Sequence, residues 1–205
     1  MNKLNYQKEL EKVLNTLQEK GESSPDWRPP RLFLHSCCAP CSSYCLEYLC
    51  RYFLITVFYY NPNISFSEEY RKRVAEQKRL IAAYNAEKKG WQIDIVEGDY
   101  EPEKFYEMAK GYENCQEGGE RCFRCFDLRL RKTAELALAG GYDYFATTLT
   151  ISPLKNVVKI NEIGQALSQE YGIPWLPSDF KKKNGYKRSI ELSAEYELYR
   201  QNYCG

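Results

Sequence analysis

Short apolar stretches alternate with polar loops and helical patterns along most of this chain, and this alternation constrains the fold more than any other feature. Five stretches carry the β-branched and aromatic residues typical of strands: residues 31–35, 54–60, 91–96, 142–149 and 173–176. Helical patterns at 42–52, 67–89, 103–111, 122–138 and up to residue 171 separate them. Repeated strand–loop–helix units predict a three-layer α/β/α fold with a mostly parallel sheet of about five strands.

The first thirty residues have a different organisation. Residues 3–20 place leucines and a valine on one helical face, and residues 21–30, with Ser-Ser-Pro and Pro-Pro, are typical of a connector. We therefore expect an N-terminal helix and connector over residues 1–30, followed by a single α/β catalytic domain over residues 31–205. A last helix is predicted over residues 189–202.

A thiol-rich loop, Cys37-Cys38-Ala-Pro-Cys41, follows the first predicted strand. Pro40 has no backbone N–H and cannot continue a central strand, so the thiols are expected in the loop beyond the strand's carboxyl end. Open α/β sheets bind ligands at that edge. A second pair, Cys122-x-x-Cys125, opens a helical pattern far along the chain. We expect the two groups to meet and to hold a metal centre.

Cysteine usage and hydropathy indicate the compartment. The chain has nine cysteines, an odd number, and it does not open with a basic-then-apolar secretory signal. A disulfide framework is therefore disfavoured, and reduced thiols are expected. The longest apolar run, residues 53–60, is too short to cross a bilayer. These features predict a soluble cytoplasmic protein that does not bind membranes.

Spacing alone leaves three kinds of thiol chemistry open. A structural zinc site could use Cys122-x-x-Cys125 as one knuckle, but the adjacent pair Cys37-Cys38 lacks knuckle spacing and Cys41 is a fifth thiol. Dithiol exchange would place a Cys-x-x-Cys motif after the first strand, where the other cluster lies. An iron–sulfur cluster tolerates irregular spacing between separate loops. A metal is predicted, and its identity stays open.

Several motifs, taken together, resemble one family. They are His35-Ser-Cys-Cys-Ala-Pro-Cys41, Asn61-Pro-Asn-Ile64 with Glu69, Tyr70 and Arg73, Gly118-Gly-Glu-Arg-Cys-Phe-Arg-Cys-Phe126 with Arg129 and Leu130, Thr147 to Asn156, Asp179 to Arg188, and Tyr199 to Gly205. In this order they resemble the epoxyqueuosine reductase QueH family, from about Arg31 to the last residue. The resemblance also implies a further cysteine after Gly205.

The resemblance implies a cobalamin-independent reductase that converts epoxyqueuosine to queuosine at the wobble position of tRNA. It further implies a [4Fe-4S] cluster and an adjacent mononuclear iron on a Rossmann-like α/β scaffold. Cys37, Cys38, Cys122 and Cys125 match the family's metal-binding positions. Cys41 occupies a position where members of the family can carry Asp, and either group can bind iron.

Removing an epoxide oxygen to form an alkene takes two electrons and two protons. Side chains cannot supply the electrons, so a cofactor and a separate electron donor are expected. An iron with an open position can act as a Lewis acid toward the epoxide oxygen. As proton donors we expect Asp99, or a tyrosine such as Tyr70 or Tyr100.

The expected partner is the anticodon stem-loop of tRNA, from which the modified base must turn out. The candidate substrate-binding residues are Asn61, Asn63, Arg73, Thr147, Thr148, Ser152, Lys155, Lys181, Lys182, Lys183, Lys187 and Arg188. Two alternatives remain. One is a non-enzymatic RNA-binding module stapled by zinc. The other is a tRNA sulfur-transfer enzyme, which would need a Gly/Ser-rich pyrophosphate loop that residues 37–43 do not provide.

Overall fold

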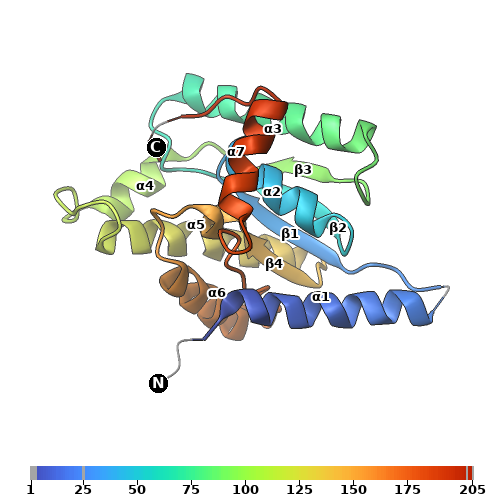
Figure 1. Ribbon diagram of the computed structural model, residues 1–205. Helices are drawn as coiled ribbons and strands as arrows, with labels where there is room; N and C mark the ends of the chain where they lie inside the picture. The colour runs from blue at the N-terminus through green and yellow to red at the C-terminus, as the bar shows by residue number, and fades with distance from the viewer. Residues whose placement is uncertain (1–3, 25, 202, 205) are drawn as a thin grey trace.

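A parallel sheet lies at the centre of the molecule (Figure 1). The computed structural model describes residues 4–24, 26–201 and 203–204. In these residues the sheet has four strands in the order β3-β2-β1-β4, and every pairing is parallel. The strands are β1 (Arg31–Ser36), β2 (Leu54–Tyr59), β3 (Asp94–Glu97) and β4 (Tyr144–Thr147). The α/β class and the parallel sheet predicted from the sequence are confirmed.

The prediction of a fifth strand is wrong. Residues 173–176 form only one bridge to the sheet, between Trp175 and Phe145. Phe145 donates its N–H to the Pro174 carbonyl, and Leu176 donates to the Phe145 carbonyl. Pro174 and Pro177 flank this contact, and neither has an N–H with which to extend a ladder. The segment therefore lies along β4 without becoming a strand.

Helices account for most of the remaining structure. They are α1 (Tyr6–Ser23), α2 (Ala39–Leu49), α3 (Ser67–Ala86), α4 (Pro102–Ala109), α5 (Glu120–Ala139), α6 (Val157–Tyr171), α7 (Gly185–Glu195) and the 3-10 turn η1 (Thr148–Ile151). None of the helices in the described ranges has the length and apolarity that a membrane crossing requires.

Two helices differ from the prediction in ways that bear on function. The α2 helix starts at Ala39 rather than Ser42, with Cys38 as its N-cap, because Pro40 suits the first turn of a helix. The thiol loop is therefore partly helical. The α7 helix starts earlier and ends at Glu195, well before residue 202, since Glu197 adopts a positive φ of 49°. Asn202 itself lies outside the described residues.

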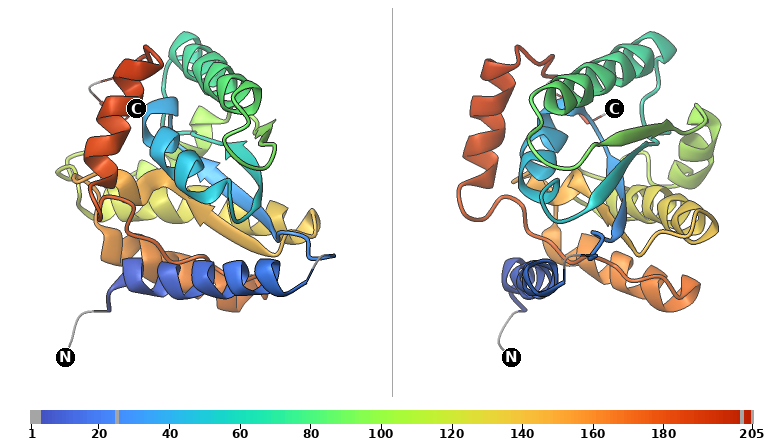
Figure 2. Two further views of the ribbon diagram at one scale, coloured as in Figure 1. Left: turned by 45° about the vertical axis from the view of Figure 1, so that its right-hand side comes forward. Right: turned by 90° about the vertical axis from the view of Figure 1, so that its right-hand side faces the viewer.

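Successive side chains of each strand point to opposite faces of the sheet, so the apolar core has one part on each face. Leu32, Leu34, Ile55 and Val57 pack with α1, α2 and α3 on one face. Phe33, Phe58 and Phe145 pack with α5 and α6 on the other. Figure 2 shows these helices flanking the sheet. Apolar burial on both faces stabilises the sheet and fixes its register, because a slip of one residue would exchange the faces.

The order of the strands determines where a ligand can enter. After β1 the chain crosses by α2 to β2 on one side, whereas β4 pairs with β1 on the other side. Ligands of open α/β sheets bind at such a switch point, outside the carboxyl ends of the strands. The residues that leave β1 and β4 at this point are Cys37 and Thr148, and the Cys37 N–H donates to Thr148 Oγ1 over 3.4 Å.

Candidate metal centre

Three thiols form a compact group at the switch point. The Sγ atoms of Cys37, Cys38 and Cys41 lie within 4.8 Å of one another. Cys37 and Cys38 are buried, and Cys41 is half-buried. The group sits on the first turn of α2, where the unpaired N–H groups and the helix dipole favour negative charge. The site therefore suits thiolates, the form in which cysteine binds metal.

Hydrogen bonding within this group favours one thiolate on Cys37. The thiols of Cys38 and Cys41 hold the pKa of Cys37 well below its usual range, against the effect of burial, and the charges of Lys155 and Arg129 add to this. The same bond to Cys37 raises the pKa of Cys38 to about 12. Proximity to Cys37 and Cys38 likewise raises the pKa of Cys41. A bound cation would allow all three to ionise.

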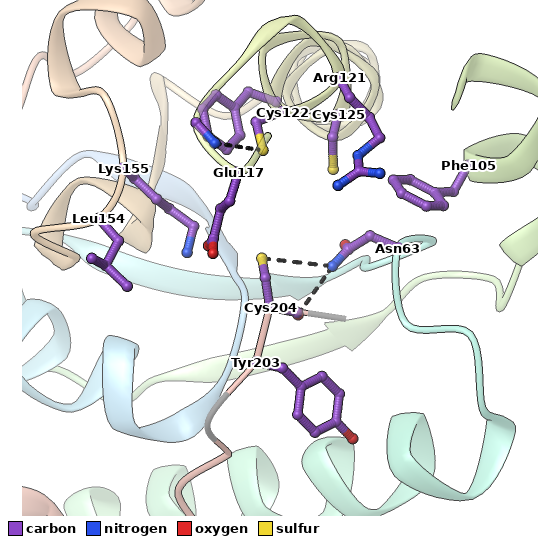
Figure 3. Close-up of a pocket in the computed structure, with 12 residues that line it drawn as sticks. Asn63, Phe105, Glu117, Arg121, Cys122, Cys125, Leu154, Lys155, Tyr203 and Cys204 are labelled. Carbon is purple, nitrogen blue, oxygen red and sulfur yellow. Dashed lines mark hydrogen bonds between the residues drawn. The ribbon is translucent and has the colours of Figure 1, made fainter. Parts of the chain in front are cut away.

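The second thiol pair lies on the first turns of α5. Cys122 is half-buried and Cys125 is buried. Both point toward the pocket shown in Figure 3, which they line together. The Gly118 N–H donates to Cys122 Sγ over 3.2 Å.

Cys204 lies between the two groups of thiols. It lines the pocket of Cys122 and Cys125 and also the adjoining hollow of Cys37, Cys38 and Cys41. Asn63 Nδ2 and Arg73 Nη1 each donate to the Cys204 carbonyl over 3.1 Å (Figure 3 shows the contact from Asn63). Two residues that we predicted to bind substrate therefore hold the C-terminal segment at the site.

Lys155 lines both hollows as well. Burial opposes the charge of this lysine, but the negative potential of Cys204, Cys37 and Cys41 outweighs burial and raises the pKa of its ammonium group. Lys155 is thus a cation at neutral pH, and it faces both the predicted metal ligands and the space beside them. Figure 3 shows its side chain pointing toward Cys204 and Glu117.

The other cysteines of α2 have a different environment. The Cys45 thiol donates to the Cys41 carbonyl over 3.3 Å, and the Cys50 thiol donates to the Glu47 carbonyl over 3.7 Å. Both side chains are part of the apolar core beneath the helix. Here cysteine serves as a small buried side chain.

Several predicted substrate-binding residues hold the scaffold together. Asn61 donates to the Ser36 carbonyl over 2.9 Å and accepts from Arg129. Thr147 Oγ1 lies 2.8 Å from His35 Nδ1, and Thr148 Oγ1 lies 3.7 Å from Cys37 Sγ. All three are buried. Ser152, by contrast, lines the hollow of Cys37 and Cys41.

The basic segment at 181–188 is paired more than its sequence indicates. Lys181 lies 2.9 Å from Asp179, Lys183 pairs with Glu11, and Arg188 makes a two-bond contact with Glu47. Lys187 and Glu191 are 4.0 Å apart and largely exposed. Lys182 is exposed, and no salt bridge to it is found among the described residues. Lys182 and Lys187 are thus the lysines of this segment most accessible to a partner.

The three predicted proton donors lie outside the two thiol-lined hollows, as far as the described residues define them. Asp99 is exposed at the end of β3. The Tyr70 hydroxyl faces the carbonyls of Gly98, at 3.0 Å, and Tyr59, at 3.3 Å. The Tyr100 hydroxyl donates to the Ser65 carbonyl over 2.8 Å.

Sequence reasoning assigned no role to two residues that the structure places at the site. Cys204 appeared only within the C-terminal motif, and its return to the thiols could not be inferred without the fold. Arg129 had a clearer signal. It falls on the helical face shared by Phe126, Leu130 and Ala134, and a basic residue on an otherwise apolar face marks a buried charge.

Comparison with known proteins shows the family of this chain. The family model described as epoxyqueuosine reductase QueH matches residues 32–205. A protein of that name from Staphylococcus epidermidis is 44% identical over 205 residues, which cover 99% of this chain and 83% of the relative. The Streptococcus pyogenes protein is 42% identical over 203 residues, 99% of this chain and 77% of the relative. The Thermotoga maritima protein is 34% identical over 180 residues, 85% of this chain and 87% of the relative. By this similarity along nearly its whole length, the chain belongs to the epoxyqueuosine reductase QueH family.

Proposed function

We propose that this protein reduces epoxyqueuosine to queuosine at the wobble position of tRNA, removing the epoxide oxygen as water with two electrons and two protons. The observation that carries the proposal is that thiols from three segments line two adjoining hollows at the carboxyl edge of the sheet, in a chain of the QueH family. The strand order β3-β2-β1-β4 also suits a Rossmann-like scaffold with its ligand at the switch point.

The donor set fits an iron–sulfur group. Cys37, Cys38, Cys122 and Cys125 provide the four thiolates that a [4Fe-4S] cluster requires. Cys41 remains beside the first two, and a closed four-ligand zinc site would leave it unused. We assign Cys41 to an adjacent mononuclear iron. When bound, these groups supply single electrons, received from a separate electron donor, and a Lewis acid for the epoxide oxygen.

Lys155 is the cation of the site that can act on the substrate. Its ammonium group lines both thiol hollows. There it can bind an oxygen that gains negative charge and hold a proton at that oxygen. This adds proton transfer to the substrate binding expected of Lys155. Asp99, Tyr70 and Tyr100 remain our proposals for the other proton, which would have to reach the site from its periphery.

The wobble nucleotide must leave the anticodon stack to enter this site. Leu154 and Tyr203 line the pocket and are 73% and 48% exposed, so they offer an apolar and an aromatic surface to an extruded base. For phosphate contacts we propose Lys182 and Lys187, whose side chains point to solvent. The partner is then the anticodon stem-loop of tRNA.

One experiment tests both cofactor and reaction. The protein purified without oxygen should be brown and carry more iron than the four atoms of one cluster. With dithionite as reductant, it should remove one oxygen atom from an anticodon stem-loop carrying epoxyqueuosine, as measured by mass spectrometry. A colourless protein with one stoichiometric zinc and no loss of oxygen would refute the proposal and favour a zinc-stapled RNA-binding module.

A further inference from the structure

A fully buried arginine lies directly beside the thiols. Arg129 is 0% exposed and lies on α5 one helical turn after Cys125. Its Nη1 group points at Cys125 Sγ over 3.8 Å. The helix that carries two predicted metal ligands therefore also carries a guanidinium group into the same interior.

Two of the hydrogen-bond partners of Arg129 carry no negative charge. Nη2 donates to Asn61 Oδ1 over 2.6 Å, and Nε donates to His35 Nε2 over 3.3 Å. Neither an asparagine amide nor a histidine ring carries a negative charge, so these partners do not offset the guanidinium. No carboxylate of the described residues pairs with Arg129. Arg73, the other large buried arginine, pairs with Glu69 over 2.7 Å.

A buried guanidinium without a counter-ion is strongly unfavourable, and buried charges in proteins are paired or lie at metal sites. The neighbour of Arg129 that can carry a negative charge is a sulfur, Cys125 Sγ, which lies 3.8 Å from Nη1. The negative charge that offsets Arg129 must therefore come from the thiolates and from whatever they bind.

The surroundings hold the guanidinium in place. His35 Nε2 lies 3.3 Å from Arg129 Nε and 3.0 Å from the Tyr60 carbonyl, and its Nδ1 lies 2.8 Å from Thr147 Oγ1. Asn61, which accepts from Arg129, donates to the Ser36 carbonyl at the end of β1. These contacts connect the ends of β1 and β4 to α5 through one side chain.

We propose that Arg129 is the counter-ion of the thiolate–metal centre and sets its reduction potential. This inference rests on the proposed function. A thiolate-bound cluster becomes more negative on reduction, and a fixed cation at this distance favours the more negative state. Arg129 should therefore make the centre easier to reduce. It acts through the ligands, without touching substrate, and is a positioning residue.

The test uses three variants of the full chain. Arg129→Gln removes the charge and keeps an amide donor, whereas Arg129→Lys keeps the charge. Arg131→Gln is the matched control, because Arg131 lies on the same helix but is exposed and pairs with Asp127 and Glu170. In each anaerobically purified protein we would measure the reduction potential by spectroscopic titration, the rate of metal loss to a chelator, and the melting temperature with and without metal.

We expect Arg129→Gln to have a more negative potential and faster metal loss than the wild type. Arg129→Lys should restore most of the wild-type potential and most of the wild-type resistance to metal loss. Arg131→Gln should match the wild type in both measurements. Metal should raise the melting temperature of Arg129→Gln by less than it raises that of the wild type. A purely structural role would lower the melting temperature of both forms equally and leave the potential unchanged.

Three results would overturn the inference: an unchanged potential in Arg129→Gln, equal metal loss in the Gln and Lys variants, or an equal gain in melting temperature on metal binding. Its failure is distinct from failure of the proposed function. If the wild-type protein holds zinc instead of iron, the reductase proposal fails, but chelation and melting still test Arg129. If the wild type holds iron and Arg129→Gln behaves like it, only the counter-ion role fails.

Discussion

At the scale of single residues, the thiols of this protein occupy two chemical environments on neighbouring elements. Cys37, Cys38 and Cys41 crowd together at the start of α2, within reach of the cations of Lys155 and Arg129. One turn further along the same helix, the Cys45 thiol turns to a backbone carbonyl within an apolar core. Metal binding is therefore expected of the first group and not of the second.

Serine substitutions should separate these roles. Cys37→Ser, Cys38→Ser, Cys122→Ser and Cys125→Ser should each lower iron content and abolish activity, because a hydroxyl replaces a soft thiolate poorly. Cys45→Ala is the matched control on α2. It should retain iron and lose about 1 kcal/mol of stability, since it removes one small buried atom. Iron analysis and urea unfolding measure both effects. Equal iron loss in the two groups would contradict this division.

The residue types of the site could be inferred from the sequence, but their hydrogen-bond partners could not. Thiols after a strand and Cys-x-x-Cys at a helix start both have local signatures. In contrast, Asn63 and Arg73 turn inward to the Cys204 carbonyl. That contact joins segments far apart in the chain, and no local pattern encodes it. A polar side chain in a motif can equally well face solvent, substrate or backbone.

At the scale of elements, the hydrophobic pattern predicted β1 and β2 closely and failed at the fifth strand. The composition of residues 173–176 favours a strand, but Pro174 and Pro177 limit pairing to one bridge. The Trp175 side chain holds this segment in place. Trp175 packs against α6, and its indole N–H donates to Asn161 Oδ1 over 3.1 Å.

Gly164 on α6 makes that packing possible. A Cβ atom at this position would come within 2.3 Å of the Trp175 ring. Gly164→Ala should therefore lower stability by about 1–3 kcal/mol through overpacking, despite a gain of up to about 1 kcal/mol in helix propensity. Gln165→Ala, exposed on the next position of the same helix, should change stability little. Urea unfolding compares them, and a Gly164→Ala protein as stable as the wild type would show that Trp175 can move aside.

At the scale of the whole molecule, topology brings the functional segments together. In a parallel sheet with helices on both faces, the loops after β1 and β4 and the start of α5 all lie at one edge. The two thiol groups predicted to meet line separate hollows there, and these hollows share Cys204 and Lys155. The return of the C-terminal segment to the same edge, where Arg73 of α3 donates to the Cys204 carbonyl, was not predictable. It depends on α7 ending at Glu195 and on contacts made only in the folded chain.

Charge at this scale bears on RNA binding. The formal net charge is +1, so the protein has no overall field that would attract a polyanion, and affinity for RNA must come from a local group of cations. Lys181, Lys183 and Arg188 already pair closely with carboxylates, whereas Lys187 is 4.0 Å from Glu191. We therefore expect the phosphate contacts of this segment to come from Lys182 and Lys187, and only weakly from its other cations.

Replacing both lysines with glutamine should weaken binding of an anticodon stem-loop and flatten its salt dependence by about 0.7 in slope for each lost contact, because fewer counterions are released. Iron content should not change, since none of the proposed ligands lies in this segment. The control is Lys20→Gln with Arg28→Gln, which removes the same charge near Arg31 and Asp143, at the amino edge of the sheet. Binding measured across a range of salt concentrations separates the outcomes. An equal effect of both double variants would indicate an unspecific charge effect, whereas an unchanged slope in the Lys182/Lys187 variant would place the RNA on another face of the protein.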